Sequence, residues 1–129
     1  MLSIDLSAVK TYGYVVKPGD VAQFHGNVVH PVCSTFVLAR EVEWTTRLFV
    51  LDLREPDEEG VGTHVSIDHK NPAFVGEEII FTARIESLEG NLLTCGYEAR
   101  VGERVIAAGR TGQRVLKKEK IEKLFGQAK

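Results

Sequence analysis

The stretch Ser34-Thr-Phe-Val-Leu-Ala-Arg-Glu-Val-Glu-Trp-Thr-Thr-Arg-Leu-Phe-Val-Leu-Asp-Leu53 predicts one long helix. Ser34 or Thr35 offers a hydroxyl that can cap its start, and Pro56 stops it inside the acidic loop 54–60. The apolar residues of the stretch cover more than one helical face, so we expect the helix to be largely buried. With a rise of about 1.5 Å per residue, it would be about 30 Å long. The segments around it then decide the fold class.

Most of the other segments show the alternation and the β-branched content of strands. We expect a first strand over 11–16 and a turn at Lys17-Pro-Gly-Asp20. Residues 21–32 have no clear period and predict a loop. Further strands are expected over 61–69, 78–86, 92–101 and 105–116, with a hairpin signal at Glu89-Gly-Asn91. A short terminal helix is expected over 117–125.

This order of elements predicts an α+β fold, in which a long central helix is wrapped by a curled antiparallel sheet of about five strands. A chain of 129 residues is most simply a single domain spanning 1–129. The net charge of -2 argues against broad nucleic-acid binding. No apolar run reaches the roughly 18 residues that span a bilayer, and the N-terminus lacks the layout of a signal peptide. We therefore expect a cytoplasmic protein without a membrane partner.

Three polar residues are candidates for chemistry: Thr35 at the helix start, Glu43 inside the helix and His69 at the end of strand 61–69. A hydroxyl, a buried carboxylate and an imidazole are the groups needed to hydrolyse an activated ester. A free imidazole exchanges its proton near neutral pH, which suits a general base. Each residue also has a structural interpretation: Thr35 as the helix cap, Glu43 as the partner of Arg47 in an i,i+4 ion pair, and His69 as an ordinary strand-end histidine.

Helix geometry limits how these residues can meet. The eight residues between Thr35 and Glu43 correspond to about 12 Å of rise and about 80° of rotation. The two side chains therefore cannot be hydrogen-bond neighbours in one regular helix. Either Thr35 lies before the helix on a chain that folds back, or the site is assembled from two subunits.

The remaining reactive residue types carry weaker signals. Cys33 and Cys95 form neither a disulfide framework nor a zinc motif, and small buried residues are the simplest interpretation. A reactive thiol at Cys33, two residues before Thr35, is the alternative. The other histidines have no metal-ligand spacing, and no Gly-x-Ser-x-Gly motif is present. We expect no metal and no cofactor.

Five segments of the chain resemble the fluoroacetyl-CoA thioesterase-like branch of the hotdog fold: Val32-Cys-Ser-Thr35, Val42-Glu-Trp44, Glu59-Gly-Val-Gly-Thr63, His69 and Gly109-Arg-Thr-Gly-Gln-Arg114. The resemblance runs from about residue 28 to 116. In that branch a threonine precedes the central helix, a glutamate follows eight residues on, and a histidine twenty-six residues later. Thr35, Glu43 and His69 fall at those spacings without gaps. Phe36 replaces the small residue of the family, and the aromatic residues expected before the helix are missing. The resemblance therefore implies thioesterase chemistry but not the fluorinated substrate.

The resemblance implies a homodimer, with a possible tetramer, whose sites lie at the subunit interface and hydrolyse a short or small acyl-CoA. Thr35, Glu43 and His69 would be catalytic, and Gly62 and Arg114 would contact the acyl group. Gly62 also has a simpler role in relieving crowding at a strand start. Arg114 could be a surface cation, with the family position falling on Gln113 instead.

The sequence leaves two alternatives to a thioesterase open. One is a module that binds acyl-CoA without turnover. The other is a hotdog enoyl-CoA hydratase, which Asp68-His-Lys-Asn-Pro72 resembles only loosely because the histidine is misplaced.

Overall fold

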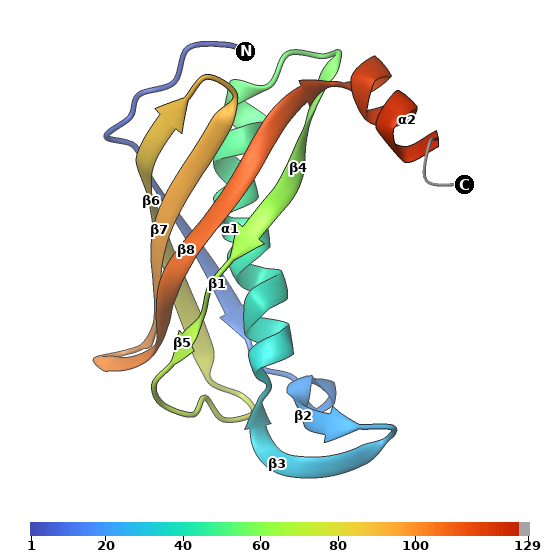
Figure 1. Cartoon of the computed structure of the whole chain (residues 1–129). Helices are drawn as coiled ribbons and strands as arrows, with labels where there is room; N and C mark the ends of the chain where they lie inside the picture. The colour runs from blue at the N-terminus through green and yellow to red at the C-terminus, as the bar shows by residue number, and fades with distance from the viewer. Residues whose placement is uncertain (127–129) are drawn as a thin grey trace.

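The computed structural model describes residues 1–126 as a long helix lying against a curled antiparallel sheet (Figure 1). The N-terminal half contains β1 (Val9–Val15), the 3-10 turn η1 (Pro18–Asp20), β2 (Val21–Phe24), β3 (Asn27–Cys33) and the central helix α1 (Thr35–Leu53). The C-terminal half contains β4 (Glu58–Val65), β5 (Asp68–His69), β6 (Glu78–Glu89), β7 (Leu92–Val101), β8 (Arg104–Lys117) and α2 (Lys118–Gly126). The main sheet has the order β1-β6-β7-β8-β4, with the short β5 also paired to β8, and every pair is antiparallel. The predicted α+β architecture is confirmed.

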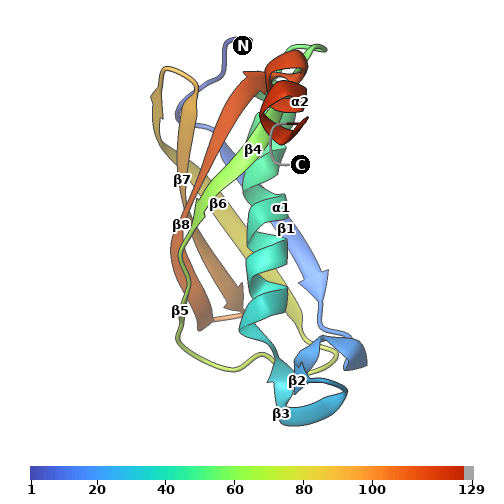
Figure 2. The same ribbon diagram turned by 45° about the vertical axis from the view of Figure 1, so that its right-hand side comes forward.

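The core lies between α1 and the inner face of the sheet, which curves around one side of the helix (Figure 2). Phe49 and Leu53 of α1 belong to the same fully buried cluster as Ile79 and Phe81 of β6 and Leu93 of β7. Burying a side chain of this size contributes about 1.5–3 kcal/mol relative to leaving it exposed. This packing fixes the position of the helix, and with it the first turn that carries Thr35.

The expectation of a largely buried helix holds for one side only. Phe36 is 79% exposed and Trp44 is 41% exposed. The side chains of Arg40 and Glu43 are exposed as well. The sheet covers α1 from one side, so the opposite face has no covering element among residues 1–126. Exposed apolar side chains on an otherwise well-packed helix are a feature of interaction surfaces.

The predicted loop at 21–32 is wrong, because these residues form the β2–β3 hairpin. Its turn is made by His25 (φ 53°) and Gly26 (φ 81°), both in the left-handed region that a tight hairpin turn requires. Histidine is an uncommon residue in that conformation, so the turn gave no strong sequence signal. The hairpin lies beside the N-terminal end of α1, at the bottom of Figure 1.

The predicted strand 61–69 is divided in two. β4 ends at Val65, and Ser66 and Ile67 leave the ladder before β5 resumes it. Ser66 is held in this break by three contacts. Its backbone O accepts a hydrogen bond from the Tyr97 hydroxyl (2.8 Å), its N–H donates to the Arg110 carbonyl (2.8 Å), and its Oγ accepts from the Arg110 N–H (3.0 Å). The break separates His69 from the main run of β4.

The acidic segment before β4 is also more ordered than a solvated loop. β4 begins at Glu58, which is only 6% exposed and accepts a hydrogen bond from the Glu55 N–H. The hairpin predicted at Glu89-Gly-Asn91 is confirmed and joins β6 to β7, and a second hairpin, which turns at Gly102, joins β7 to β8. None of the helices within residues 1–126 is long and apolar enough to cross a membrane.

Candidate active site

The two adjacent hydroxyls at the start of α1 have different partners. Ser34 is the N-cap: its Oγ accepts a hydrogen bond from the Val37 N–H at 3.1 Å. Capping by Ser34 satisfies one of the free N–H groups of the first turn. Thr35 is therefore the first helical residue, and its hydroxyl is not used as the cap.

The Thr35 hydroxyl instead contacts His69. Its Oγ1 lies 2.9 Å from His69 Nδ1, across 34 residues of sequence. His69 is positioned by β5, where it pairs with Ala107 of β8, and the following Lys70 N–H donates to the Ile106 carbonyl. Thr35 is exposed and His69 is partly buried, so a substrate can reach the pair. A hydroxyl within hydrogen-bond reach of an imidazole nitrogen is the arrangement of a nucleophile and its base.

Glu43 is not brought to this pair within one chain. It lies two turns further along α1, and no hydrogen bond or ion pair of its carboxylate is found within residues 1–126. Its expected burial is wrong, since the side chain is exposed. The expected i,i+4 partner Arg47 pairs with Glu59 (2.8 Å) instead.

The buried carboxylate of α1 is Glu41, which is 7% exposed. Glu41 accepts hydrogen bonds from the Tyr12 hydroxyl (3.3 Å) and from Arg40 Nε (2.7 Å). Sequence reasoning missed it because a buried and an exposed glutamate two residues apart look alike until the rotational phase of the helix is known.

Glu43 lines a cavity of about 320 Å³. Gly62 of β4 and Gln113 of β8 line it, and the two residues are paired in the sheet. A Cβ added to Gly62 would lie 3.6 Å from Glu43 Oε1, so the two residues are close neighbours. We call this the Glu43 cavity.

Arg114 does not line the Glu43 cavity. It is exposed, and its Nη1 donates to Asn91 Oδ1 at 2.8 Å. Because successive residues of a strand point to opposite faces, Gln113 faces the cavity and Arg114 faces away. Gln113 is 8% exposed, and its Nε2 donates to Thr46 Oγ1 of α1 at 3.2 Å.

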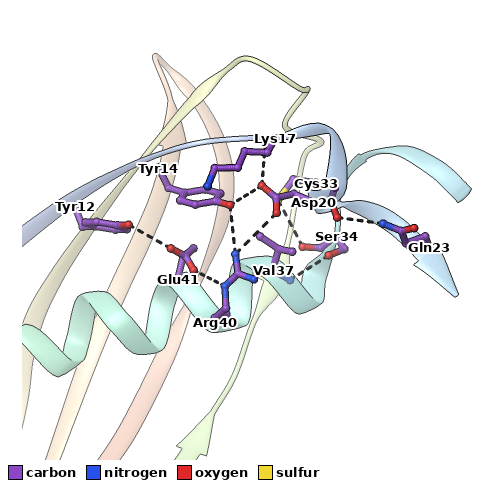
Figure 3. Close-up of polar contacts among 11 residues, drawn as sticks. Tyr12, Tyr14, Lys17, Asp20, Gln23, Cys33, Ser34, Val37, Arg40 and Glu41 are labelled. Atoms are coloured by element: carbon purple, nitrogen blue, oxygen red, sulfur yellow. Dashed lines mark hydrogen bonds and ion pairs between the residues drawn. The ribbon is translucent and has the colours of Figure 1, made fainter. Parts of the chain in front are cut away.

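A polar network ties the first turns of α1 to β1 and η1 (Figure 3). The carboxylate of Asp20 accepts hydrogen bonds from the Tyr14 hydroxyl (2.6 Å) and the Lys17 N–H (2.8 Å), and its backbone carbonyl accepts one from the Ser34 N–H (2.9 Å). Arg40 donates to the Tyr14 hydroxyl at 3.3 Å. Burial, followed by the hydrogen bond to Asp20, raises the pKa of Tyr14 to about 12, so the phenol stays protonated and donating. The network holds Ser34, and therefore Thr35, in place.

Cys33 precedes the cap residue but is unsuited to nucleophilic attack. It is 1% exposed, and burial raises the pKa of its thiol to about 11. A thiolate, not a thiol, is the nucleophile. The reactive-thiol alternative is therefore disfavoured at neutral pH. Within residues 1–126, no group of three or more His, Cys, Asp or Glu side chains is placed to hold a metal ion.

Comparison with known proteins gives a consistent result. Residues 16–119 match the family described as FlK, fluoroacetyl-CoA-specific thioesterase. A Thermus thermophilus hypothetical protein, described as a thioesterase superfamily member, is 32% identical; the match covers 99% of this chain and 95% of that one, with a TM-score of 0.94. The crystal structure of the fluoroacetyl-CoA thioesterase FlK is 22% identical over 98% of each chain, with a TM-score of 0.89. A hot-dog-like protein from Thermanaerovibrio acidaminovorans is 16% identical, with 95% of this chain and 91% of that chain covered and a TM-score of 0.87. No curated protein matches the chain.

The fold and these matches define a thioesterase of the hotdog type that hydrolyses acyl-CoA thioesters. Within that class, the chain belongs to the fluoroacetyl-CoA-specific thioesterase family.

Proposed function

We propose that Thr35 and His69 carry out the hydrolysis, with Thr35 as the nucleophile and His69 as its base. The observation that carries this assignment is the 2.9 Å contact between Thr35 Oγ1 and His69 Nδ1. A general base must lie within about 2.6–3.2 Å of the group whose proton it takes. With Nδ1 unprotonated, the threonine hydroxyl donates to it and becomes a stronger nucleophile.

The reaction proceeds in two steps. First, Oγ1 bonds to the thioester carbonyl carbon while its proton passes to Nδ1. The C–S bond then breaks, and the imidazolium returns the proton to the leaving CoA sulfur. In the second step, water attacks the acyl-threonine ester and His69 takes a proton from that water. The imidazolium then returns this proton to Oγ1 as the C–Oγ1 bond breaks, which releases the free acid and restores the hydroxyl. The backbone N–H groups of Thr35 and Phe36, which lack intrahelical acceptors in the first turn of α1, are suited to stabilise the oxyanion.

Glu43 completes the site from a second copy of the chain. Because Thr35 occupies Nδ1, the Nε2 of His69 remains available for a carboxylate that fixes the tautomer and stabilises the imidazolium. Glu43 of the same chain is about 12 Å further along α1 and has no such contact. A homodimer would supply the missing carboxylate.

Two surface features support this homodimer. β4 ends the order of the main sheet, so its outer edge is unpaired within residues 1–126 and can accept a strand from another copy. Trp44, beside Glu43 and 41% exposed, provides apolar area for the same contact. Pairing of two such dimers into a tetramer stays a prediction.

In this homodimer, the Glu43 cavity of one copy would lie at the thioester end of the substrate that is bound at Thr35 and His69 of the other copy. Gly62 and Gln113 then contact the carbonyl end of the acyl group, and Gln113 takes the role that the sequence prediction gave to Arg114. Crystal structures of FlK include a complex with acetyl-CoA, in keeping with an acyl-CoA substrate here.

We place the protein in the cytoplasm, since its two cysteines are free.

Release of free thiol from acyl-CoA tests the assignment. We expect His69→Ala to lower kcat by about a hundredfold or more, because a positioned base contributes about 10²–10⁴. Thr35→Ala should be similarly impaired, whereas Thr35→Ser keeps the hydroxyl and retains activity. His25→Asn, in the exposed β2–β3 turn, is the matched control. Full activity of His69→Ala would contradict the assignment, and tight binding without any thiol release would identify a binding module instead.

A further inference from the structure

Another cavity, of about 640 Å³, lies between the β2–β3 hairpin and the start of α1. We call it the hairpin cavity. Thr35 and Phe36 line it from α1, and Val21, Ala22 and Phe24 line it from β2. Thr35 is thus shared by the hairpin cavity and the contact with His69. A group bonded to Thr35 Oγ1 can extend into this space.

The volume and the lining of the hairpin cavity suit more than an acetyl group. Pockets of about 300–1,000 Å³ hold whole drug-sized ligands, and 640 Å³ lies well inside that range. The lining is mostly apolar, and Phe24 and Phe36 are 69% and 79% exposed. Covering these rings with an apolar chain would remove hydrocarbon surface from water on both sides.

The charged groups in the wall do not favour an anionic ligand. Asp20 and Arg40 both line the hairpin cavity. Arg40 is paired with Glu41 (2.7 Å) and lies 3.9 Å from Asp20, so two carboxylates oppose its single positive charge. A carboxylate at the end of an acyl chain would meet this paired arginine and the imidazole of His30, but no lysine among the residues that line the cavity.

We propose that the acyl group is an uncharged apolar chain longer than acetyl and that it lies in the hairpin cavity. This inference rests on the proposed function for the location of the thioester carbonyl. The binding of the chain is nevertheless separable from hydrolysis, because a thioether analogue of the substrate binds without reacting.

The test uses the full-length protein and three CoA thioethers with uncharged alkyl chains, S-ethyl-, S-butyl- and S-hexyl-CoA, and binding is measured by isothermal titration calorimetry. Each methylene that enters the cavity contributes up to about 0.8 kcal/mol, or about fourfold in Kd. We expect S-hexyl-CoA to bind at least about tenfold more tightly than S-ethyl-CoA. S-carboxypropyl-CoA, which has nearly the shape of S-butyl-CoA but carries a terminal carboxylate, should bind more weakly than S-butyl-CoA.

Variants locate the chain. Ala22→Phe fills the cavity and should lower the affinity for S-hexyl-CoA to about that for S-ethyl-CoA, which abolishes the preference for the longer chain. Val28→Phe, on the same hairpin but outside the cavity lining and 60% exposed, is the matched control. If Ala22→Phe does not fold, Phe24→Ala removes an exposed wall residue and should weaken S-hexyl-CoA binding selectively.

Equal affinity for S-ethyl- and S-hexyl-CoA would overturn the inference. So would a preference for S-hexyl-CoA that survives in both Ala22→Phe and Phe24→Ala. Thiol release from hexanoyl-CoA is measured separately: its absence, with the binding preference intact, would refute the catalytic assignment and leave the acyl site standing.

Discussion

At the scale of single residues, the site depends on how three successive side chains divide their roles. Cys33 is buried, Ser34 caps α1, and Thr35 contacts His69. Ser34 and Thr35 are both residue types that cap helices. The use of Ser34 as the cap leaves the Thr35 hydroxyl available for chemistry, which residue types alone could not decide.

The thiol of Cys33, two residues before Thr35, should be unreactive in the folded protein. Burial raises the pKa of its thiol to about 11, so the thiolate fraction stays small until the pH approaches that value. We expect a thiol-specific reagent such as DTNB to react slowly with the folded protein at pH 8 and rapidly after denaturation. Cys33→Ala should keep thioesterase activity. Rapid labelling of the folded protein at Cys33, with loss of activity, would contradict this assignment.

At the scale of elements, the first turn of α1 is the part that organises the site. Its cap, the Asp20 network and the contact with His69 join η1, α1 and β5 at one point. The pairing of the two-residue strand β5 with β8 holds His69 there. A change in the geometry of this turn would therefore move Thr35, the proposed nucleophile, relative to His69, its proposed base.

Replacement of Ser34 measures the contribution of the cap. We expect Ser34→Ala to lower the free energy of unfolding by about 1 kcal/mol, because one N–H of the first turn loses its acceptor. Ser34→Asn keeps a capping oxygen and should lose less. Thermal or urea unfolding provides the measurement. A Ser34→Ala protein as stable as the parent would show that the cap is energetically unimportant.

Periodicity in the sequence predicted the elements with regular patterns, but not those set by local turn geometry. The long helix, the β6–β7 and β7–β8 hairpins and the terminal helix follow from apolar spacing and glycine turns. The β2–β3 hairpin did not, because its turn uses His25 in a left-handed conformation. The break at Ser66 is held by Tyr97 and Arg110, which are far away in the sequence.

Spacing predicted part of the candidate site. Thr35 and His69 were expected to meet, and they are 2.9 Å apart. The choice between Arg114 and Gln113 could not be made from sequence, because a shift of one residue moves a strand side chain to the opposite face. The exposure of Glu43 depends on the rotational phase of α1, which is fixed only by packing against the sheet.

At the scale of the whole molecule, one chain presents two separate groups of candidate site residues. Thr35 and His69 are in contact, and Glu43 lines a cavity with Gly62 and Gln113. We propose that each group is one half of a site. A twofold dimer would place the first half-site of each copy against the second half-site of its partner, so that catalysis would require both copies.

Complementation between inactive variants tests whether each site is shared between two copies of the chain. His69→Ala and Glu43→Ala are each expected to lose activity. Refolding an equal mixture should restore about a quarter of the parent activity, because half of the dimers are mixed and each mixed dimer has one intact site. The matched control is a mixture of His69→Ala with Thr35→Ala, which should stay inactive because both changes fall in the same half-site. Recovery in the first mixture alone is the result predicted here; a first mixture no more active than its components would contradict a site shared between two copies.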